Sequence, residues 1–113
     1  MSSAASRKRF IDNAVEFIRK WGFQGLDLDW EYPKCWQVNC DAGPDADKEN
    51  FAALVRELRA AFDAEGEGCL LSAATSPSKK VIIDYPTLKL VSNVSNDTKF
   101  HLIGCAFFCL INL

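Results

Sequence analysis

Apolar residues recur at helical spacing in two segments of the chain. The first stripe predicts a helix over about residues 6–20, and the second predicts a helix over about residues 47–64. Ser3 or Ser6 can cap the start of the first helix, and Gly22 suits the left-handed position after its end. Asp45 or Asp47 can cap the start of the second helix.

Each predicted helix is followed by a short segment with the character of a β-strand. The first, residues 23–31, stops at Tyr32-Pro33, because proline cannot donate to a strand ladder. The second, residues 69–74, is short and apolar, which is typical of a buried parallel strand. The order helix, strand, helix, strand predicts the α/β class, with parallel strands joined by helical crossovers.

The first predicted strand carries three acids at alternate positions. A strand sends alternate side chains to one face, so Asp27, Asp29 and Glu31 share a face. Leu26 and Leu28 point to the other face. Strands flanked by helices usually belong to parallel sheets that are buried on both faces. Carboxyl groups crowded on a buried face are the arrangement by which enzymes tune catalytic acids.

Two kinds of chemistry suit these carboxylates. They could hold Mg²⁺ or Ca²⁺, which prefer oxygen ligands. Alternatively, one carboxylic acid could protonate a leaving-group oxygen, as in glycoside hydrolysis. Trp30, Tyr32 and Trp36 lie near the acidic end of the strand, and aromatic rings stack well on sugars, so these residues favour sugar hydrolysis. By strand parity, however, Trp30 falls on the opposite face and could simply pack against a helix.

Composition narrows the range of partners. The 113 residues suit one small domain, and the formal net charge of −2 gives no reason to expect nucleic acid or an anionic membrane as a partner.

The five cysteines match no zinc pattern, and we expect no metal and no cofactor. Cys35 and Cys40 are close enough in sequence for a disulfide in a secreted protein, although two unpaired thiols fit equally well. No secretory signal is visible in the polar residues 1–6.

The segment 23–33, which reads FQGLDLDWEYP, closely resembles the signature of family 18 glycoside hydrolases, the chitinases and chitinase-like proteins. In this family the pattern Asp-x-x-Asp-x-Asp-x-Glu lies on the fourth strand of a (β/α)8 TIM barrel. The flanking segments resemble arthropod chitinases in particular, over residues 34–40, 43–44, 47–51 and 70–74. The resemblance covers about residues 7–88. It implies a partial barrel that comprises the third helix, fourth strand, fourth helix and fifth strand.

The resemblance also implies a role for each acid. Glu31 would be the general acid that protonates the glycosidic oxygen of chitin or a chito-oligosaccharide. Asp29 would turn toward Glu31 or toward the substrate's N-acetyl group, whose carbonyl oxygen attacks the anomeric carbon, and Asp27 would tune Asp29 from below. Substrate-assisted catalysis of this kind needs no enzymic nucleophile. Family members of this type are mostly secreted, which implies an extracellular location and suits a bridge between Cys35 and Cys40.

The sequence departs from the family in three ways. Gln24 stands where the family usually has its first Asp, and we expect it to affect packing or a backbone hydrogen bond rather than proton transfer. The first three barrel strands and the later Met-x-Tyr-Asp-like segment are missing from residues 1–90, as is the tryptophan that floors the sugar site. Residues 91–113 read as a divergent tail of unknown structure.

These departures predict that the chain by itself is marginally stable and hydrolyses chitin weakly or not at all. Two strands cannot close a barrel, and both edges of the pair would leave backbone groups unpaired. One alternative is a chitin-binding, chitinase-like fragment without catalysis, which binds through Trp36 and Tyr32. Another is a gene-model fragment with no function of its own.

Overall fold

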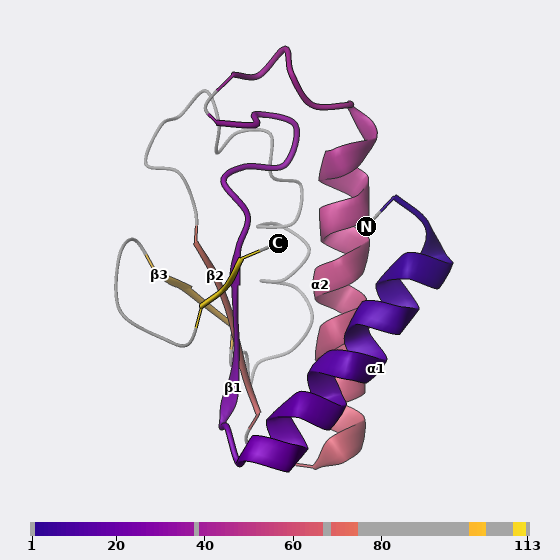
Figure 1. Cartoon of the computed structure of the whole chain (residues 1–113), viewed down its shortest axis with the longest axis vertical. Coiled ribbons are helices and arrows are strands. Elements are labelled where there is room, and N and C mark those ends of the chain that lie inside the picture. Colours follow the sequence, from indigo (N-terminus) through magenta and orange to yellow (C-terminus); the bar gives the residue numbers. More distant parts are fainter. Residues whose placement is uncertain (1, 38, 67–68, 75–99, 104–109, 113) are drawn as a thin grey trace.

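A computed structural model describes residues 2–37, 39–66, 69–74, 100–103 and 110–112 of the chain. The first four elements, in chain order, are helix α1 (Ala4–Trp21), strand β1 (Gly25–Asp29), helix α2 (Ala46–Glu65) and strand β2 (Leu70–Ala74) (Figure 1). Two short strands follow, β3 (Phe100–Ile103) and β4 (Leu110–Asn112). The predicted alternation of helix and strand is therefore confirmed over residues 4–74.

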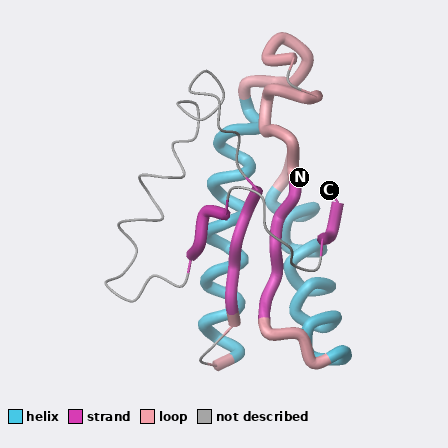
Figure 2. Tube along the Cα trace, turned by 90° about the vertical axis from the view of Figure 1, so that its left-hand side faces the viewer, coloured by secondary structure: helices cyan, strands magenta, loops and turns pink. Residues whose placement is uncertain are grey.

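The strands form a four-stranded parallel sheet in the order β3-β2-β1-β4. In its centre, β1 and β2 lie in a register that pairs Leu26 with Leu71 and Asp27 with Ser72. Both helices lie on the same side of these strands, to their right in Figure 1 and behind them in Figure 2. This arrangement leaves the other side of β1 uncovered by either helix, and that side carries the acids.

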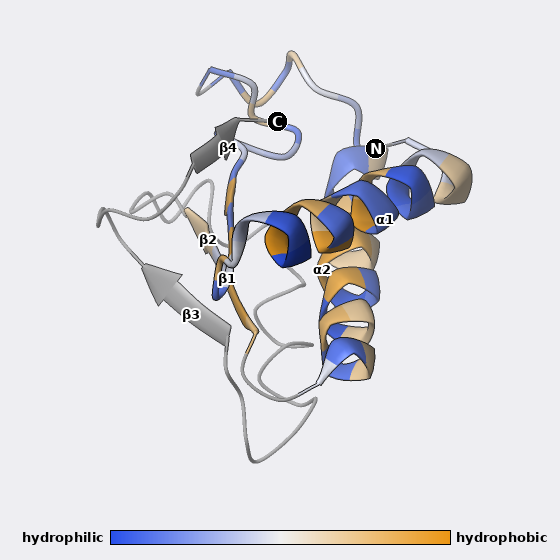
Figure 3. Cartoon of the chain, turned by 60° about the horizontal axis from the view of Figure 1, so that its bottom comes forward, coloured by the Kyte–Doolittle hydropathy of each residue, from blue (hydrophilic) through white to orange (hydrophobic). Residues whose placement is uncertain are grey.

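The hydrophobic core lies between the two helices and the sheet. Figure 3 shows the apolar stripes of α1 and α2 turned toward one another and toward the strands. Leu28 of β1 has no exposed surface, and neither do Leu54 and Leu58 of α2. Burying a leucine side chain contributes roughly 1.5–3 kcal/mol to stability. These residues therefore pack β1 firmly against the helices.

The predicted ends of α1 are confirmed. Ser3 and Ser6 form a capping box in which each side chain bonds the backbone N–H of the other residue. Gly22 follows the helix in the left-handed conformation, with φ of 69°, and its N–H donates to the Ile18 carbonyl. Along the helix, the Arg7 guanidinium binds the Glu57 carboxylate at 3.0–3.1 Å and so ties α1 to α2. Within the described residues, no helix has the length and apolar character to span a membrane.

The prediction that an aspartate side chain caps α2 is wrong. Asp45 occupies the cap position but makes no capping hydrogen bond with its side chain. Its carboxylate instead forms an ion pair with Lys34, and the Asp47 carboxylate accepts bonds from the preceding loop. Both carboxylates therefore bind the loop that precedes α2 rather than the backbone N–H groups in the first turn of α2.

Both central strands are shorter than predicted. Strand β1 begins at Gly25 rather than Phe23, and its ladder starts where the Gln24 carbonyl accepts from the Leu70 N–H at 2.8 Å. Strand β2 begins at Leu70, because the Cys69 carbonyl accepts a hydrogen bond from Arg59 of α2 at 2.9 Å. Hydrogen bonds to residues distant in sequence thus set limits that hydropathy alone does not show.

The close approach of β1 and β2 requires glycine at position 25. A Cβ atom there would lie only 2.7 Å from the Leu70 Cβ. Such a separation is shorter than van der Waals contact and would push the two strands apart. The glycine that opens the acidic segment thus has a packing role.

The expectation that both edges of the β1–β2 pair leave backbone groups unpaired is wrong. Strand β3 pairs with β2, and strand β4 pairs with β1, both in parallel. The segment after residue 90 therefore supplies neighbours for both central strands, which relieves the edge problem. The predicted loop over residues 75–80 and the amphipathic patch over residues 81–91 lie outside the described residues. The division of the chain at about residue 90 stays a prediction.

Candidate active site

Two of the three predicted site acids share one face of β1. Asp27 and Asp29 are half-buried, whereas Leu26 and Leu28, which alternate with them, are buried against the helices. Alternation along the strand therefore separates the two carboxylates from the core, as predicted.

Asp27 is held by a neighbouring strand. The Ser72 hydroxyl of β2 donates to the Asp27 Oδ1, and the two residues are register partners across the sheet. A hydrogen bond to a charged group is among the stronger interactions in proteins. Sequence reasoning missed Ser72, although a hydroxyl in the middle of an apolar strand is a signal that could have found it.

Asp29 has a carboxylate oxygen that none of the described residues binds. Its Oδ1 atom is buried and accepts no hydrogen bond from any residue that the structure describes. A buried polar atom without a partner is costly, and such atoms concentrate where a ligand or a moving side chain completes the bonding. Asp29 lies at the carboxyl end of β1, where an α/β barrel places its active site.

Glu31 lies beyond the end of the strand. The prediction that all three acids share one strand face is wrong for Glu31, because β1 ends at Asp29 and parity carries no further. The Glu31 side chain is exposed, and its peptide bond to Tyr32 is cis. The backbone carbonyl of Glu31 accepts from the Gln37 N–H at 3.3 Å, so the loop folds back over this residue.

The three predicted substrate-binding aromatics fall into two groups. The Trp30 ring meets Phe51 of α2 edge-on, with centroids 5.9 Å apart, and Tyr32 packs against the core cluster. Trp36 remains 45% exposed. Its indole Nε1–H donates to the Asp47 Oδ2 at 2.8 Å. Among the three, Trp36 therefore offers the most exposed ring to a ligand.

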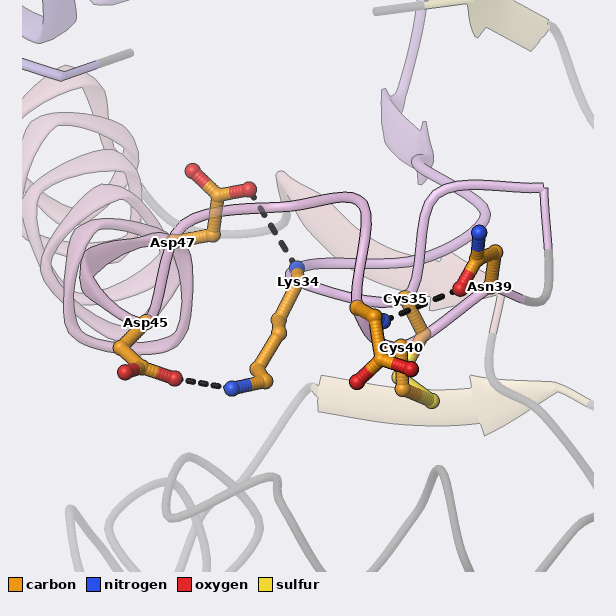
Figure 4. The surroundings of a disulfide bond; sticks show 7 residues. Lys34, Cys35, Asn39, Cys40, Asp45 and Asp47 are labelled. Atoms are coloured by element: carbon orange, nitrogen blue, oxygen red, sulfur yellow. Dashed lines mark hydrogen bonds and ion pairs between the residues drawn. A yellow bond between two sulfur atoms is a disulfide. The ribbon is translucent and has the colours of Figure 1, made fainter.

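A disulfide joins Cys35 and Cys40 in the loop between β1 and α2. Figure 4 shows this bridge next to Lys34, whose ammonium group pairs with Asp45. Lys34 holds the pKa of the Asp45 carboxyl below its usual value of 3.8, through the hydrogen bond first and its charge second. The Gly43 N–H donates to the Lys34 carbonyl at 2.9 Å, so the base of the loop is closed by backbone as well.

The Gln24 amide also lies where the sequence predicted. Its Nε2 donates to the Gly22 carbonyl at 3.2 Å, away from the acids. Within the described ranges, no three His, Cys, Asp or Glu side chains gather as a metal site would require.

Carboxylates at the carboxyl end of a parallel strand that is backed by helices are typical of the active-site end of α/β-barrel enzymes. Residues 1–101 match the model of the glycosyl hydrolases family 18. The chain therefore belongs to this family of glycoside hydrolases.

Several relatives of the chain carry the name chitinase. Probable chitinase 10 of Drosophila melanogaster is 52% identical over 80 residues, which cover 71% of this chain and 3% of that protein. Probable endochitinase of Caenorhabditis elegans is 44% identical over 87 residues, which cover 74% of this chain and 13% of that protein. The chain thus spans a small part of the relatives that it matches.

A solved structure agrees with these matches. Catalytic domain 2 of the Ostrinia furnacalis Group II chitinase superposes with a TM-score of 0.71 at 54% identity. The superposition covers 78% of this chain and 23% of that domain. A mutant of the same domain, in complex with penta-N-acetylchitooctaose, superposes with a TM-score of 0.70.

Proposed function

We propose that this chain carries the acidic strand of a chitinase, which hydrolyses β-1,4-linked N-acetylglucosamine polymers by a substrate-assisted, retaining mechanism. The observation that carries the proposal is the buried Asp29 Oδ1 at the carboxyl end of β1, which no described residue binds and which lies two residues before an exposed Glu31. Membership of family 18 and the sugar-bound complex of the Ostrinia domain support the substrate class.

In this proposal the described elements are part of a (β/α)8 barrel. Helix α1, strand β1, helix α2 and strand β2 correspond to its third helix, fourth strand, fourth helix and fifth strand. The parallel pairing of β1 with β2 supports this assignment, and so do the two helices on one side of the sheet. The acidic side of β1 would face the barrel interior, and its carboxyl end would open into the substrate cleft.

Glu31 acts as the general acid. Its carboxyl proton passes to the glycosidic oxygen while the bond from that oxygen to the anomeric carbon breaks. The carbonyl oxygen of the substrate's own N-acetyl group forms the new bond to that carbon. Water then opens this cyclic intermediate, and the Glu31 carboxylate takes up the proton that the water releases. The exposed position of Glu31 is consistent with direct access to a polymer.

Asp29 holds the N-acetyl group during this step. Its Oδ1, which no described residue binds, accepts a hydrogen bond from the substrate's amide N–H or from the Glu31 carboxyl group, and either bond satisfies a buried acceptor. Asp27, which Ser72 binds, lies deeper on the same face and tunes Asp29 from below. Asp27 is thus the deepest of the three acids in the site, Asp29 lies above it, and Glu31 is nearest to solvent.

The 113-residue chain by itself should turn over chito-oligosaccharides weakly or not at all. Electrostatic catalysis depends on walls that exclude water from the reacting groups. Neither described helix covers the acidic side of β1. Clear hydrolysis by the purified chain, lost in Glu31→Gln, would refute this expectation and assign full activity to the chain alone.

A chimera tests the assignment of the acids. Residues 1–90 would replace the matching segment of the Ostrinia catalytic domain, with which the chain shares 54% identity. We expect the chimera to hydrolyse chito-oligosaccharides, and Glu31→Gln to lower its kcat by roughly 10²–10⁴-fold, the usual contribution of a general acid. A Glu49→Gln chimera, changed at an exposed acid of α2, serves as the control. A folded chimera that keeps its activity with Glu31→Gln would exclude the proposed role.

A second candidate function is chitin binding without hydrolysis. The exposed ring of Trp36 supports it, because aromatic rings with one open face suit the apolar faces of sugars. Retention of the chain on chitin beads without release of soluble sugar would favour this function, and loss of retention in Trp36→Ala would assign it to that ring. The disulfide between Cys35 and Cys40 supports an extracellular location for either function.

A further inference from the structure

Among the described residues, Asp47 is the one charged side chain that is buried, with 8% of its surface exposed. It lies in the first turn of α2. Its Oδ2 atom accepts two hydrogen bonds from the loop that precedes the helix, one from the Trp36 indole at 2.8 Å and one from the Lys34 backbone N–H at 3.3 Å. One carboxylate oxygen therefore binds this loop at two points.

A carboxylate is well suited to this position. Burial of a charge is costly unless strong partners surround it, and both donors here point at the same oxygen. The positive end of the helix dipole adds a favourable contribution in the first turn. An alanine would leave the indole N–H without this acceptor, and an asparagine would keep the shape but lose the charge.

The loop that Asp47 holds leads directly to Glu31. Trp36 is followed by Gln37, whose N–H donates to the Glu31 carbonyl at 3.3 Å. Trp36 also forms a β-bridge with Asn39, and the disulfide closes the same stretch from Cys35 to Cys40. The backbone next to the indole is therefore hydrogen-bonded to the backbone of Glu31, the proposed general acid.

We propose that Asp47 is a positioning residue that holds the Trp36 ring, on the loop that follows Glu31, as a platform for a pyranose ring of a chito-oligosaccharide. This inference rests on the proposed function and adds a specificity element to it. The indole N–H is engaged by Asp47, which fixes one edge of the ring, while 45% of the Trp36 surface remains open. A platform whose orientation is set in advance loses less entropy when a sugar binds.

The experiment uses the full 113-residue chain labelled with ¹⁵N, with chitopentaose as the probe. Its three tryptophans give three indole N–H signals, and the Trp36→Phe variant identifies the one that belongs to Trp36. We expect this signal to move on titration with sugar and to exchange slowly with solvent before titration. In Asp47→Asn the exchange should be at least about tenfold faster, and the dissociation constant for chitopentaose should rise roughly 3- to 10-fold.

Two comparisons separate positioning from general stability. Glu49→Gln changes an exposed acid in the same first turn of α2 and should leave both the Trp36 signal and the dissociation constant unchanged. In the Trp36→Phe background, Asp47→Asn should weaken sugar binding by less than about twofold, because the ring that it positions is gone. A purely structural role for Asp47 would weaken binding equally in both backgrounds.

Equal sugar affinity in wild type and Asp47→Asn would overturn the inference. So would a Trp36 indole signal in the wild-type chain that does not respond to saturating sugar, a measurement that needs no variant to fold. Neither result bears on the role of Glu31, which the turnover of the chimera decides separately.

Discussion

The two faces of β1 differ in what surrounds them. On one face, Leu26 and Leu28 are 6% and 0% exposed and lie against the helices. On the other face, Asp27 and Asp29 are half-buried, and one carboxylate oxygen has no partner among the described residues. A single five-residue strand thus separates the residues that stabilise the fold from those proposed to act on a substrate, by alternation alone.

This separation means that substitutions on the two faces should have different consequences. Changes on the apolar face should lower the free energy of unfolding, because they leave cavities in a packed core. Changes on the acidic face should affect stability only where a hydrogen bond is lost, and should otherwise affect catalysis. Three predictions follow this difference and a fourth concerns the loop after β1; they run from the largest expected effect to the smallest.

Leu28→Ala should destabilise the chain most, by about 2–5 kcal/mol, because Leu28 is fully buried between the sheet and the helices. Urea unfolding followed by circular dichroism measures the change. Leu70→Ala is the matched control, since Leu70 is 43% exposed on the neighbouring strand and should cost under about 1 kcal/mol. Similar losses for the two variants would show that the apolar face of β1 is not the centre of the core.

Asp27→Ala should have an intermediate effect, a loss of about 1–2 kcal/mol in the free energy of unfolding. The Ser72 hydroxyl donates to this carboxylate, and the substitution leaves that hydroxyl without its acceptor. Ser72→Ala should cost a similar amount, and the double variant should cost clearly less than the sum. Additive losses would mean that the two side chains do not stabilise one another.

Asp29→Asn should change the free energy of unfolding by less than about 0.5 kcal/mol, because its buried Oδ1 accepts no hydrogen bond within the described part of the chain. In the chimera, the same substitution should lower kcat by about 10²-fold, since a fixed acceptor for the N-acetyl group is weakened. Stability and turnover measured on the same variant check this pair of outcomes. A large loss of stability with normal turnover would reverse the roles assigned to the two faces.

Asp45 should give the smallest effect on stability, and its pH dependence identifies it. Lys34 lowers the pKa of this carboxyl in the folded chain below its ordinary value of 3.8. The stabilisation that the ion pair with Lys34 provides is therefore complete above pH 3.8 and is lost as the pH falls through the lower pKa of the folded chain. Denaturant midpoints of wild type and Asp45→Asn, measured from pH 6 down to about pH 2, should differ at the upper end and converge at the lower. A difference that grows on acidification would mean that the ion pair does not stabilise the folded chain.

Local sequence patterns predicted the elements well and their ends unevenly. The capping box at Ser3 and the left-handed Gly22 follow from residues within one turn of each other, and both predictions hold. The strand ends were missed because Leu70 and Arg59, which lie far away in sequence, supply the hydrogen bonds that set them. Glu31 was placed on the strand for a related reason, since parity alone does not reveal where a ladder stops.

The candidate site divides in the same way. Asp27, Asp29, Glu31 and the family signature could be read from the sequence, because alternation and a motif are properties of consecutive residues. Ser72 and Asp47 could not be connected to the site in that way, since their partners lie 45 and 11 residues away. A hydrogen bond between distant residues exists only once packing brings the elements together.

By itself, the sequence determined the order of helices and strands, the apolar and acidic faces of β1 and the membership of family 18. The tertiary structure alone decided that one Asp29 oxygen has no partner among the described residues, that Asp47 holds the loop of Trp36, and that β3 and β4 flank the central strands. The physical reason is range. Periodicity and capping act over a few residues, whereas the partner of a buried polar group depends on which distant segment folds against it.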